Sequence, residues 1–139
     1  MTLVRPADAA DAGAVWPLVA DFATSYVPER EVFATSFNDL IARDDTVVLV
    51  AEQGGAIGGY LLASIHGTFF ANAPVAWVEE VMVEPASRRN GIGAKLMAEA
   101  ESWARSQGAA YISLATRRAA AFYDALGYED SAAFFRKLL

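Results

Sequence analysis

The sequence predicts a mixed α/β fold, in which a central mixed β-sheet of six to seven strands is flanked by about four helices. Runs of β-branched residues, which favour strands, alternate along the 139 residues with segments whose apolar residues recur at helical spacing. Between residues 77 and 115, a strand, a glycine-rich turn, a helix and a second strand follow one another. This order predicts a right-handed β-α-β crossover with parallel strands.

The N-terminal half is expected to contribute three strands and two helices. In chain order these are a strand at residues 2–5, helices at 7–23 and 29–42, and strands at 46–52 and 57–66. Asp8 or Asp11 can cap the first helix, because a short carboxylate accepts hydrogen bonds from the free N–H groups of a helix start. Gln53-Gly54-Gly55 separates the last two strands, which is typical of a hairpin turn.

The C-terminal half is expected to add two helices and at least three strands. These are a strand at residues 73–83, a helix at 91–107, a strand at 110–115, a helix at 117–126 and one or two closing strands within 128–138. The strand at 73–83 is almost continuously apolar, which indicates burial on both of its faces. Gly108 and Gly127 end the two helices, because glycine readily takes the left-handed conformation that stops a helix.

Composition narrows the class of protein. Hydrophobic residues make up 55% of the chain and charged residues 20%, which is typical of a folded globular domain, here expected to span residues 1–139. No apolar run reaches the roughly 20 residues of a membrane span, and no signal peptide is evident, so we expect a cytoplasmic protein that binds no membrane. An excess of 17 acidic over 11 basic residues disfavours nucleic-acid binding. With no cysteine and one histidine, we expect no disulfide and no metal site.

The segment Arg88-Arg89-Asn90-Gly91-Ile92-Gly93 predicts a turn that binds phosphate at the start of a helix. A helix N-terminus presents unpaired N–H groups, glycine lets an anion approach the backbone, and the arginines add positive charge. The alternative is a tight turn whose glycines only permit close packing. A P-loop requires Lys-Ser/Thr where this chain has Ala94-Lys95, and a dinucleotide-binding turn requires a third glycine where it has Leu96. A phosphate ligand of another kind is therefore favoured.

Three segments resemble those of the GCN5-related N-acetyltransferases (GNAT). Residues 83–96 resemble motif A, whose core is Arg/Gln-x-x-Gly-x-Gly/Ala after a strand that ends in Val-x-Pro. Residues 121–128, Ala-Phe-Tyr-Asp-Ala-Leu-Gly-Tyr, resemble motif B, and Tyr123 follows Gly93 by 30 positions. Gly58-Gly59-Tyr60-Leu61 resembles the family's third strand. Together with the order of the elements, the resemblance covers nearly the whole chain and implies the twisted mixed sheet of this family.

The resemblance implies that acetyl-CoA is the acyl donor. It places the pyrophosphate against the backbone N–H groups of residues 88–94 and pairs the pantetheine arm with a strand end. The residues that it implies in donor binding are Val81, Met82, Val83, Arg88, Arg89, Asn90, Gly91, Ile92, Gly93, Ala94, Thr116 and Phe122. Thr116 departs from the family pattern, in which many relatives carry Asn, and its hydroxyl can cap the helix expected from Arg117.

Acyl transfer to an amine requires a neutral amine, a hydrogen-bond donor to the oxyanion and a proton for the leaving thiolate. Tyr123 matches the motif B tyrosine, and a phenol stays protonated at neutral pH, so we expect Tyr123 to be the general acid. The alternative for Tyr123 is a core aromatic residue.

Glu79 and Glu80 lie inside an apolar strand, where a carboxylate is costly to bury. Many relatives use a carboxylate of the fourth strand to relay the amine proton through water, so the resemblance implies that either residue can serve as the base. The alternative is a partly exposed pair bound to Arg88 or Arg89. Only one of the two can face the substrate unless a bulge intervenes, and we favour Glu79.

Four aromatic residues are candidates for the wall of the acceptor site. In the family, the first two helices and the loop before the fourth strand wall this site, which implies an apolar pocket lined by Tyr26, Phe33, Phe70 and Trp77. We expect a small-molecule primary amine as acceptor, and the acidic chain favours a cationic one. A protein N-terminus or lysine is an alternative acceptor. An acyl-CoA-binding protein without activity and a nucleotide-binding module are alternative functions, and a homodimer is left open.

Overall fold

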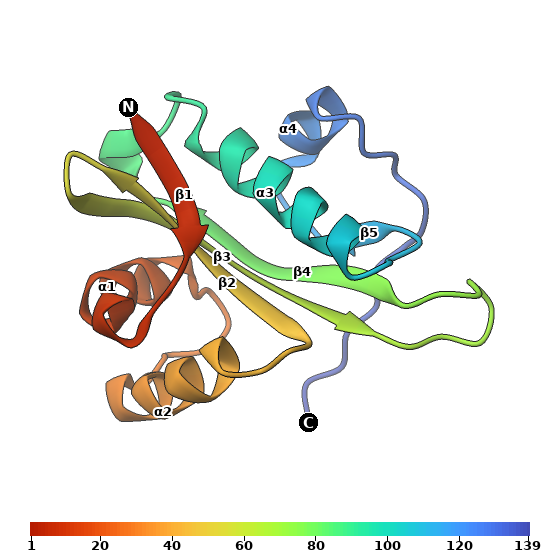
Figure 1. Cartoon of the computed structure of the whole chain (residues 1–139), viewed down its shortest axis with the longest axis horizontal. Helices are drawn as coiled ribbons and strands as arrows, with labels where there is room; N and C mark the ends of the chain where they lie inside the picture. The colour runs from red at the N-terminus through yellow and green to blue at the C-terminus, as the bar shows by residue number, and fades with distance from the viewer.

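A computed structural model describes residues 1–139 and shows a five-stranded sheet with helices on both of its faces (Figure 1). The strands are β1 (Thr2–Pro6), β2 (Thr46–Gln53), β3 (Ala56–His66), β4 (Val75–Val83) and β5 (Ile112–Leu114). The α-helices are α1 (Ala12–Phe22), α2 (Arg30–Ile41), α3 (Ile92–Ser106) and α4 (Ala120–Ala125). Two 3₁₀ turns, η1 (Ala9–Asp11) and η2 (Pro85–Ser87), precede α1 and α3.

The five strands lie in chain order across the sheet. Neighbours from β1 to β4 are antiparallel, whereas β4 and β5 are parallel and are joined through α3. This pairing confirms the predicted mixed α/β class and the parallel arrangement of the crossover strands. β5 pairs with β4 only over Ala76–Val78, although β4 continues to Val83. The second half of β4 therefore pairs with β3 alone, and no strand covers its other edge.

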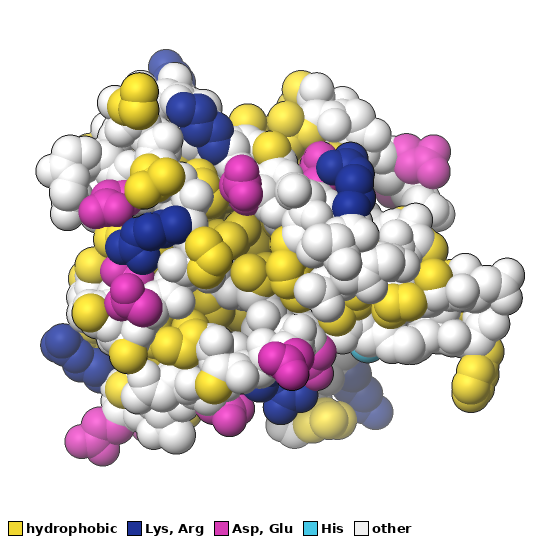
Figure 2. Space-filling model, in the orientation of Figure 1, with side chains coloured by type: hydrophobic (Ala, Val, Ile, Leu, Met, Phe, Trp, Pro, Cys, Tyr) yellow, Lys and Arg dark blue, Asp and Glu magenta, His cyan; other side chains and the backbone are white.

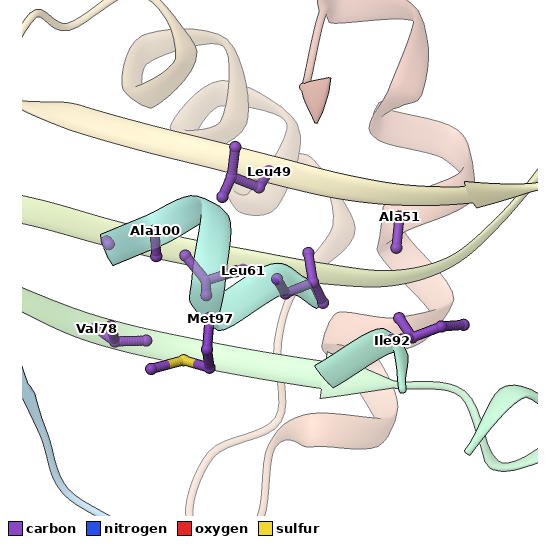
Figure 3. Packing of buried hydrophobic residues seen from close by; sticks show 9 residues of the cluster. Leu49, Ala51, Leu61, Val78, Ile92, Met97 and Ala100 are labelled. Carbon is purple, nitrogen blue, oxygen red and sulfur yellow. The ribbon is translucent and has the colours of Figure 1, made fainter. Parts of the chain in front are cut away.

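Both faces of the sheet are buried, each against its own helices. In β2, Leu49 and Ala51 pack on the α3 side, whereas Val48 and Val50 pack on the side of α1 and α2, as the two-residue period of a strand requires. The cluster on the α3 side joins β2, β3, β4 and the buried stripe of α3 (Figure 3). Its members are Leu49, Ala51, Leu61, Ala63, Val78, Ile92, Leu96, Met97 and Ala100. Burial on both faces explains why β2 and β3 are nearly continuous apolar runs.

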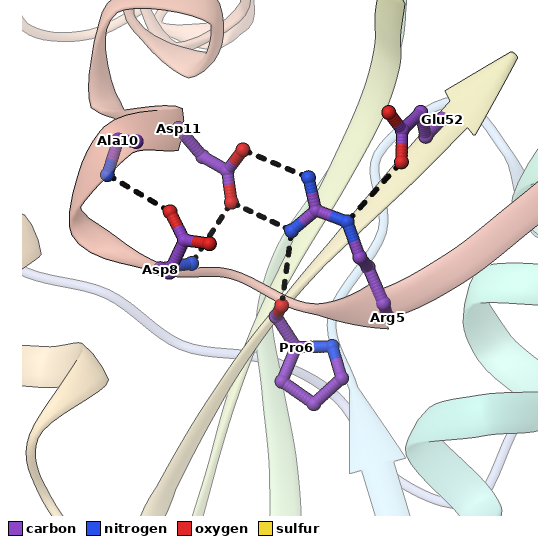
Figure 4. Close-up of polar contacts among 6 residues, drawn as sticks. All are labelled: Arg5, Pro6, Asp8, Ala10, Asp11 and Glu52. Carbon is purple, nitrogen blue, oxygen red and sulfur yellow. Dashed lines mark hydrogen bonds and ion pairs between the residues drawn. The ribbon is translucent and has the colours of Figure 1, made fainter. Parts of the chain in front are cut away.

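A cluster of ion pairs fixes the start of the first helix to the sheet (Figure 4). Asp8 accepts a hydrogen bond from the Ala10 N–H at 2.9 Å, and Asp11 accepts one from the Asp8 N–H at 2.8 Å, which closes a capping box. Arg5 of β1 donates hydrogen bonds of 2.8 and 2.9 Å to Asp11 and one of 3.2 Å to Glu52 of β2. The hydrogen bonds from Arg5 hold the pKa of Asp11 below its ordinary value. Asp8 therefore caps the helical start, as predicted, although the first turn is 3₁₀.

The C-terminal segment differs from the prediction. Residues 126–139 form no strand, so the sheet has five strands rather than six or seven. The Tyr128 hydroxyl donates a hydrogen bond of 2.7 Å to Glu101 Oε2 in α3, and the Tyr128 N–H donates one of 3.0 Å to the Tyr123 carbonyl in α4. Beyond Tyr128, residues 129–139 are exposed and form no strand, and the Phe134 ring stacks on Trp77 of β4 at a centroid distance of 6.3 Å.

The last helix is shorter than predicted, because α4 begins at Ala120 rather than at Arg117. The Thr116 hydroxyl accepts a hydrogen bond of 3.1 Å from the Ala119 N–H and stabilises a turn before the helix. Arg117 and Arg118 lie in that turn, and positive charge is unfavourable in the first turn of a helix. Thr116 thus caps the turn that leads into α4, and the other elements lie where the sequence predicts them apart from their terminal residues.

We predict that Leu61→Ala lowers the free energy of unfolding by about 2–5 kcal/mol, because it creates a cavity at the centre of β3. Leu61 is fully buried in the cluster on the α3 side, whereas Leu3 on the edge strand β1 is 57% exposed. Leu3→Ala is the control and should change the free energy of unfolding by less than about 0.5 kcal/mol. Urea unfolding followed by circular dichroism measures both variants, and equal losses would contradict this placement of the core.

Candidate active site

The candidate site begins where β4 runs beyond the end of β5. The Glu84 N–H donates a hydrogen bond of 2.8 Å to the Gly58 carbonyl of β3. Because successive residues of a strand direct their backbone groups to opposite edges, those of Val81 and Val83 point to the edge that β5 does not reach. The Val83 carbonyl accepts a hydrogen bond of 3.0 Å from Arg88 Nε. The remaining groups of this open edge can pair with an extended ligand.

A β-bulge at Glu79 interrupts β4 close to the point where β5 ends. Leu62 of β3 pairs with Glu80 and Ala63 pairs with Val78, which leaves Glu79 without a partner. A bulge re-aims side chains, so Glu79 and Glu80 are not constrained to opposite faces as they would be in a regular strand. Glu79 is exposed, so the burial predicted on both faces of this strand applies only to its first half.

Glu80 is a hydrogen-bonded and largely buried carboxylate on the side of the sheet that α1 and α2 cover. The Tyr60 hydroxyl donates a hydrogen bond of 2.6 Å to Glu80 Oε1. Burial raises the pKa of Glu80, the hydrogen bond from Tyr60 opposes this rise, and the charge of Glu79 adds to it. Burial and the Glu80 charge also raise the pKa of Tyr60, which therefore stays a donor. The two carboxylates thus lie within electrostatic reach of one another but in different surroundings.

The turn between β4 and α3 presents unpaired backbone donors. Arg89 and Gly91 have φ angles of 70° and 75°, a left-handed conformation that is unstrained only for glycine. No side chain caps α3, and the Lys95 N–H makes the first helical hydrogen bond, of 3.1 Å, to the Gly91 carbonyl. The N–H groups of residues 92–94 therefore have no intrahelical partner. Such a helix start suits a phosphate group.

Side chains around η2 hold this turn in shape. The Ser87 hydroxyl donates a hydrogen bond of 2.7 Å to Glu84 Oε1, and the Ser87 N–H donates one of 3.0 Å to the Glu84 carbonyl. Arg88 folds back on the end of β4, as its bond to the Val83 carbonyl shows. Arg89 and Asn90 are exposed, so their side chains are accessible to an anion at the helix start.

Phe122 and Tyr123 of α4 pack against the start of α3. A Cβ on Gly93 would lie only 3.1 Å from Phe122 Cζ, so the glycine permits this contact. The Tyr123 ring meets the rings of Phe122 and Tyr128 edge-on, at centroid distances of 4.9 and 5.8 Å. Burial raises the pKa of Tyr123. The ring is therefore fixed by its neighbours, and its hydroxyl stays protonated over a wide pH range.

The aromatic residues predicted to line an acceptor pocket lie in different places. Phe70 and Trp77 line an open cavity of about 1110 Å³ beside β5, and Tyr123 lines the same cavity. Phe33 lines a separate cavity of about 100 Å³ between α1, α2 and the sheet. Tyr26 is 69% exposed and lines neither cavity. The structure thus offers two distinct spaces to an acceptor, and the role of each residue in binding stays a prediction.

Tyr60 is a site residue that the sequence pattern does not single out. It lies in the run Gly58-Gly59-Tyr60-Leu61, but only the pairing of β3 with β4 brings its hydroxyl to Glu80, which is 20 positions away. A tyrosine and a carboxylate in two consecutive apolar strands are the signal that indicates such a pair, because each needs a polar partner when it is buried.

The sequence model of the acetyltransferase (GNAT) family matches residues 14–128. The chain belongs to the GNAT family. It is 25% identical over 139 residues to the uncharacterized N-acetyltransferase YhfO of Bacillus subtilis (strain 168), with 94% of this chain and 92% of that protein covered. A solved transcriptional regulator from Bacillus halodurans C-125 is 23% identical, with a TM-score of 0.90 over the full length of both chains. A glucosamine-6-phosphate N-acetyltransferase from Arabidopsis thaliana is 20% identical, with a TM-score of 0.88 over 99% of this chain and 98% of that chain.

Membership of the GNAT family makes the protein an acetyl-CoA-dependent acyltransferase. Acidic and basic side chains are scattered over the face of the enzyme that Figure 2 shows, with hydrophobic side chains between them. None of its helices combines the length and the apolar character that a membrane span requires. No three potential ligand side chains gather to hold a metal ion.

We predict that Gly91→Ala weakens the binding of acetyl-CoA by the GNAT enzyme. Gly91 and Gly55 have φ angles of 75° and 83°, and a Cβ would meet nothing within 4 Å at either position. Alanine should therefore cost about 1–2 kcal/mol of backbone strain at both positions. Only Gly91 begins α3, so only Gly91→Ala should raise the Kd for acetyl-CoA in calorimetric titration. The same increase in Gly55→Ala would argue against donor binding at this turn.

Proposed function

We propose that the enzyme transfers an acetyl group from acetyl-CoA to a small-molecule primary amine, with Tyr123 as general acid and Glu79 as base. The main observation that supports this function is the position of the open edge of β4. The edge runs from the uncapped start of α3 to the bulge at Glu79, and Phe122 holds Tyr123 beside the same helix start. An extended thioester suits such an edge, with its phosphates at one end and its reacting carbonyl near the other.

The groups along this path fit the chemistry of the donor. The free N–H groups of residues 92–94 and the exposed Arg89 suit a pyrophosphate. Val81 and Val83 offer backbone donors and acceptors to the amides of a pantetheine arm. Met82 packs its side chain toward α1 and α2 and pairs with Tyr60 of β3, so we assign the donor contacts to its two neighbours.

In the proposed reaction, the neutral amine nitrogen attacks the thioester carbonyl carbon, a C–N bond forms and the C–S bond breaks. A water molecule relays the amine proton to Glu79, and Tyr123 gives its phenolic proton to the departing thiolate. The products are the acetylated amine and CoA thiol. The proton on Glu79 returns to Tyr123 through solvent, so both groups regain their starting states.

Glu79 is better suited than Glu80 to accept the amine proton. Glu79 is exposed at the bulge and has no partner in the strand ladder. Glu80 is partly buried and accepts the hydrogen bond from Tyr60. Burial also raises the pKa of Glu80, whereas the exposed Glu79 is open to the water molecule that relays the proton.

A small acceptor is supported by the glucosamine-6-phosphate N-acetyltransferase that shares this fold, because its named substrate is a small amine. The net charge of −6 and the pair of glutamates favour a cationic acceptor. Release of CoA thiol with a panel of small amines and peptides tests this class. Turnover of peptides alone would indicate a protein acetyltransferase, and acetyl-CoA binding without any product would indicate an acyl-CoA-binding protein.

We predict that Tyr123→Phe lowers kcat by about 10²–10⁴-fold and leaves the KM for acetyl-CoA nearly unchanged, because it removes only the phenolic proton. Tyr128→Phe is the matched control, since the Tyr128 hydroxyl is hydrogen-bonded to Glu101. Its kcat should stay close to that of the wild type. Thiol release with the best amine of the panel measures both variants, and a near-normal kcat in Tyr123→Phe would exclude the acid role.

We predict that Glu79→Gln lowers kcat/KM for the amine, because it removes the proposed base. If Glu80 were the base instead, kcat/KM would rise with pH above the ordinary carboxyl range, because burial raises the pKa of Glu80. Glu80→Gln would then remove that rise. The pH–rate profiles of the two variants decide between the carboxylates, and two unchanged profiles would rule out both.

A further inference from the structure

A cavity of about 100 Å³ lies between α1, α2 and the sheet, and we propose that it binds a short branched alkyl group of the acceptor amine. The acceptor is then a short aliphatic primary amine, such as 3-methylbutylamine, whose nitrogen lies beside Glu79 and Glu80. This assignment rests on the proposed function, because it names the substrate class of the same site.

The cavity is apolar except at two residues. Eight of its ten lining residues are hydrophobic, among them Val15 of α1 and Phe33 of α2, and the other two are Ser36 and Glu80. An apolar cavity of about 150 Å³ accommodates benzene, so this smaller space suits an alkyl group of a few carbons better than an aromatic ring.

The polar end of the cavity suits an ammonium group. The Tyr60 hydroxyl binds Glu80 Oε1, and no protein group donates a hydrogen bond to Glu80 Oε2. A partly buried carboxylate with a free oxygen favours a cationic partner. Glu79 precedes Glu80 at the bulge, close enough for its charge to act on Glu80. An alkylammonium with its chain in the cavity therefore has its nitrogen beside Glu80, one residue from the proposed base.

The presence of Glu80 distinguishes this cavity from a packing defect. An empty void in a protein core is lined by apolar groups and stays dry. Here a carboxylate lines the cavity, where an aliphatic side chain would fill the space without the cost of desolvating a charge. The exposed Ser36 on its rim also connects the cavity with the surface of α2. Both features favour a binding role.

Filling the cavity from its rim tests this assignment. Ser36→Trp introduces a bulky ring without removing a core side chain, because Ser36 is exposed and lines the cavity. Asn38→Trp is the matched control, since Asn38 is an exposed residue of α2 that does not line the cavity. The acceptors are 3-methylbutylamine and ethanolamine, two primary amines of which only the first carries a branched alkyl group. Rates are measured as CoA thiol release.

The wild-type enzyme should use 3-methylbutylamine with a kcat/KM at least about tenfold above that for ethanolamine, because the alkyl group is buried. Ser36→Trp should lower the kcat/KM for 3-methylbutylamine more than that for ethanolamine, which abolishes this preference, and it should leave the KM for acetyl-CoA unchanged. Asn38→Trp should keep the preference. Ser36→Leu fills less of the cavity and should reduce the preference partially, which keeps the test valid if the tryptophan variant fails to fold.

Equal kcat/KM values of the wild type for the two amines would contradict the alkyl site. The site would also be contradicted if Ser36→Trp and Asn38→Trp both lowered kcat/KM equally for the two amines. Acetyl transfer to amines would stand in either case. Binding of acetyl-CoA without turnover of 3-methylbutylamine would also overturn the alkyl site. Absence of both acetyl-CoA binding and turnover across a wide amine panel would instead contradict the proposed function.

Discussion

The hydrogen bonding of β4 changes along its length, and the arrangement of the site depends on this change. Up to Val78 the strand is paired on both edges, and beyond the bulge at Glu79 only β3 pairs with it. An open strand edge is normally a liability, because its free N–H and C=O groups can pair with another chain. Here the open edge leads to the start of α3, whose N–H groups are also free. The groups available to a donor substrate are therefore mainly backbone groups, and their positions are set by the fold.

The two faces of the sheet differ in how completely they are packed. On the α3 side, nine buried residues form one cluster around Leu61 and Leu96. On the other side, the space between α1, α2 and the sheet retains a cavity that reaches Glu80. A carboxylate in such surroundings is costly, and the short hydrogen bond from Tyr60 offsets part of that cost. In the proposed function, the donor binds at the open edge of β4 and the α3 helix start, and the acceptor binds on the side with the cavity.

The ion pairs at the N-terminus connect the sheet with α1, the helix that lines one side of the cavity. Arg5 joins β1 to Asp11 at the start of α1 and to Glu52 in β2. Val15, which lines the cavity, follows about one helical turn after Asp11. The position of the α1 side of the cavity therefore depends on the ion pair between Arg5 and Asp11. Because Arg5 lowers the pKa of Asp11, the contribution of this pair to stability is present above the ordinary carboxyl pKa. It is lost progressively as the pH falls from that value through the lowered pKa of Asp11.

The sequence by itself determined the features that depend on neighbouring residues. β-branched runs predicted β2 and β3, helical spacing predicted α3, and the strand-turn-helix-strand order predicted the parallel pair of β4 and β5. The motifs around Gly93 and Tyr123 led to the GNAT family, because their residue types and spacing are visible along the chain. The same local patterns predicted that the start of α3 would suit a phosphate, since glycines next to a helix start have this property wherever they occur.

Only the tertiary structure decided the features that depend on contacts between distant segments. The sheet ends at β5, since residues 126–139 form no strand, and the Tyr128 hydroxyl binds Glu101 of α3. The bulge at Glu79 depends on the register between β3 and β4, and the same register brings Tyr60 to Glu80. A strand's side-chain pattern shows which residues alternate, but it does not show which residue of another strand lies opposite. For this reason the sequence indicated two candidate glutamates, of which we favoured Glu79, and the fold placed one in solvent and the other beside a cavity.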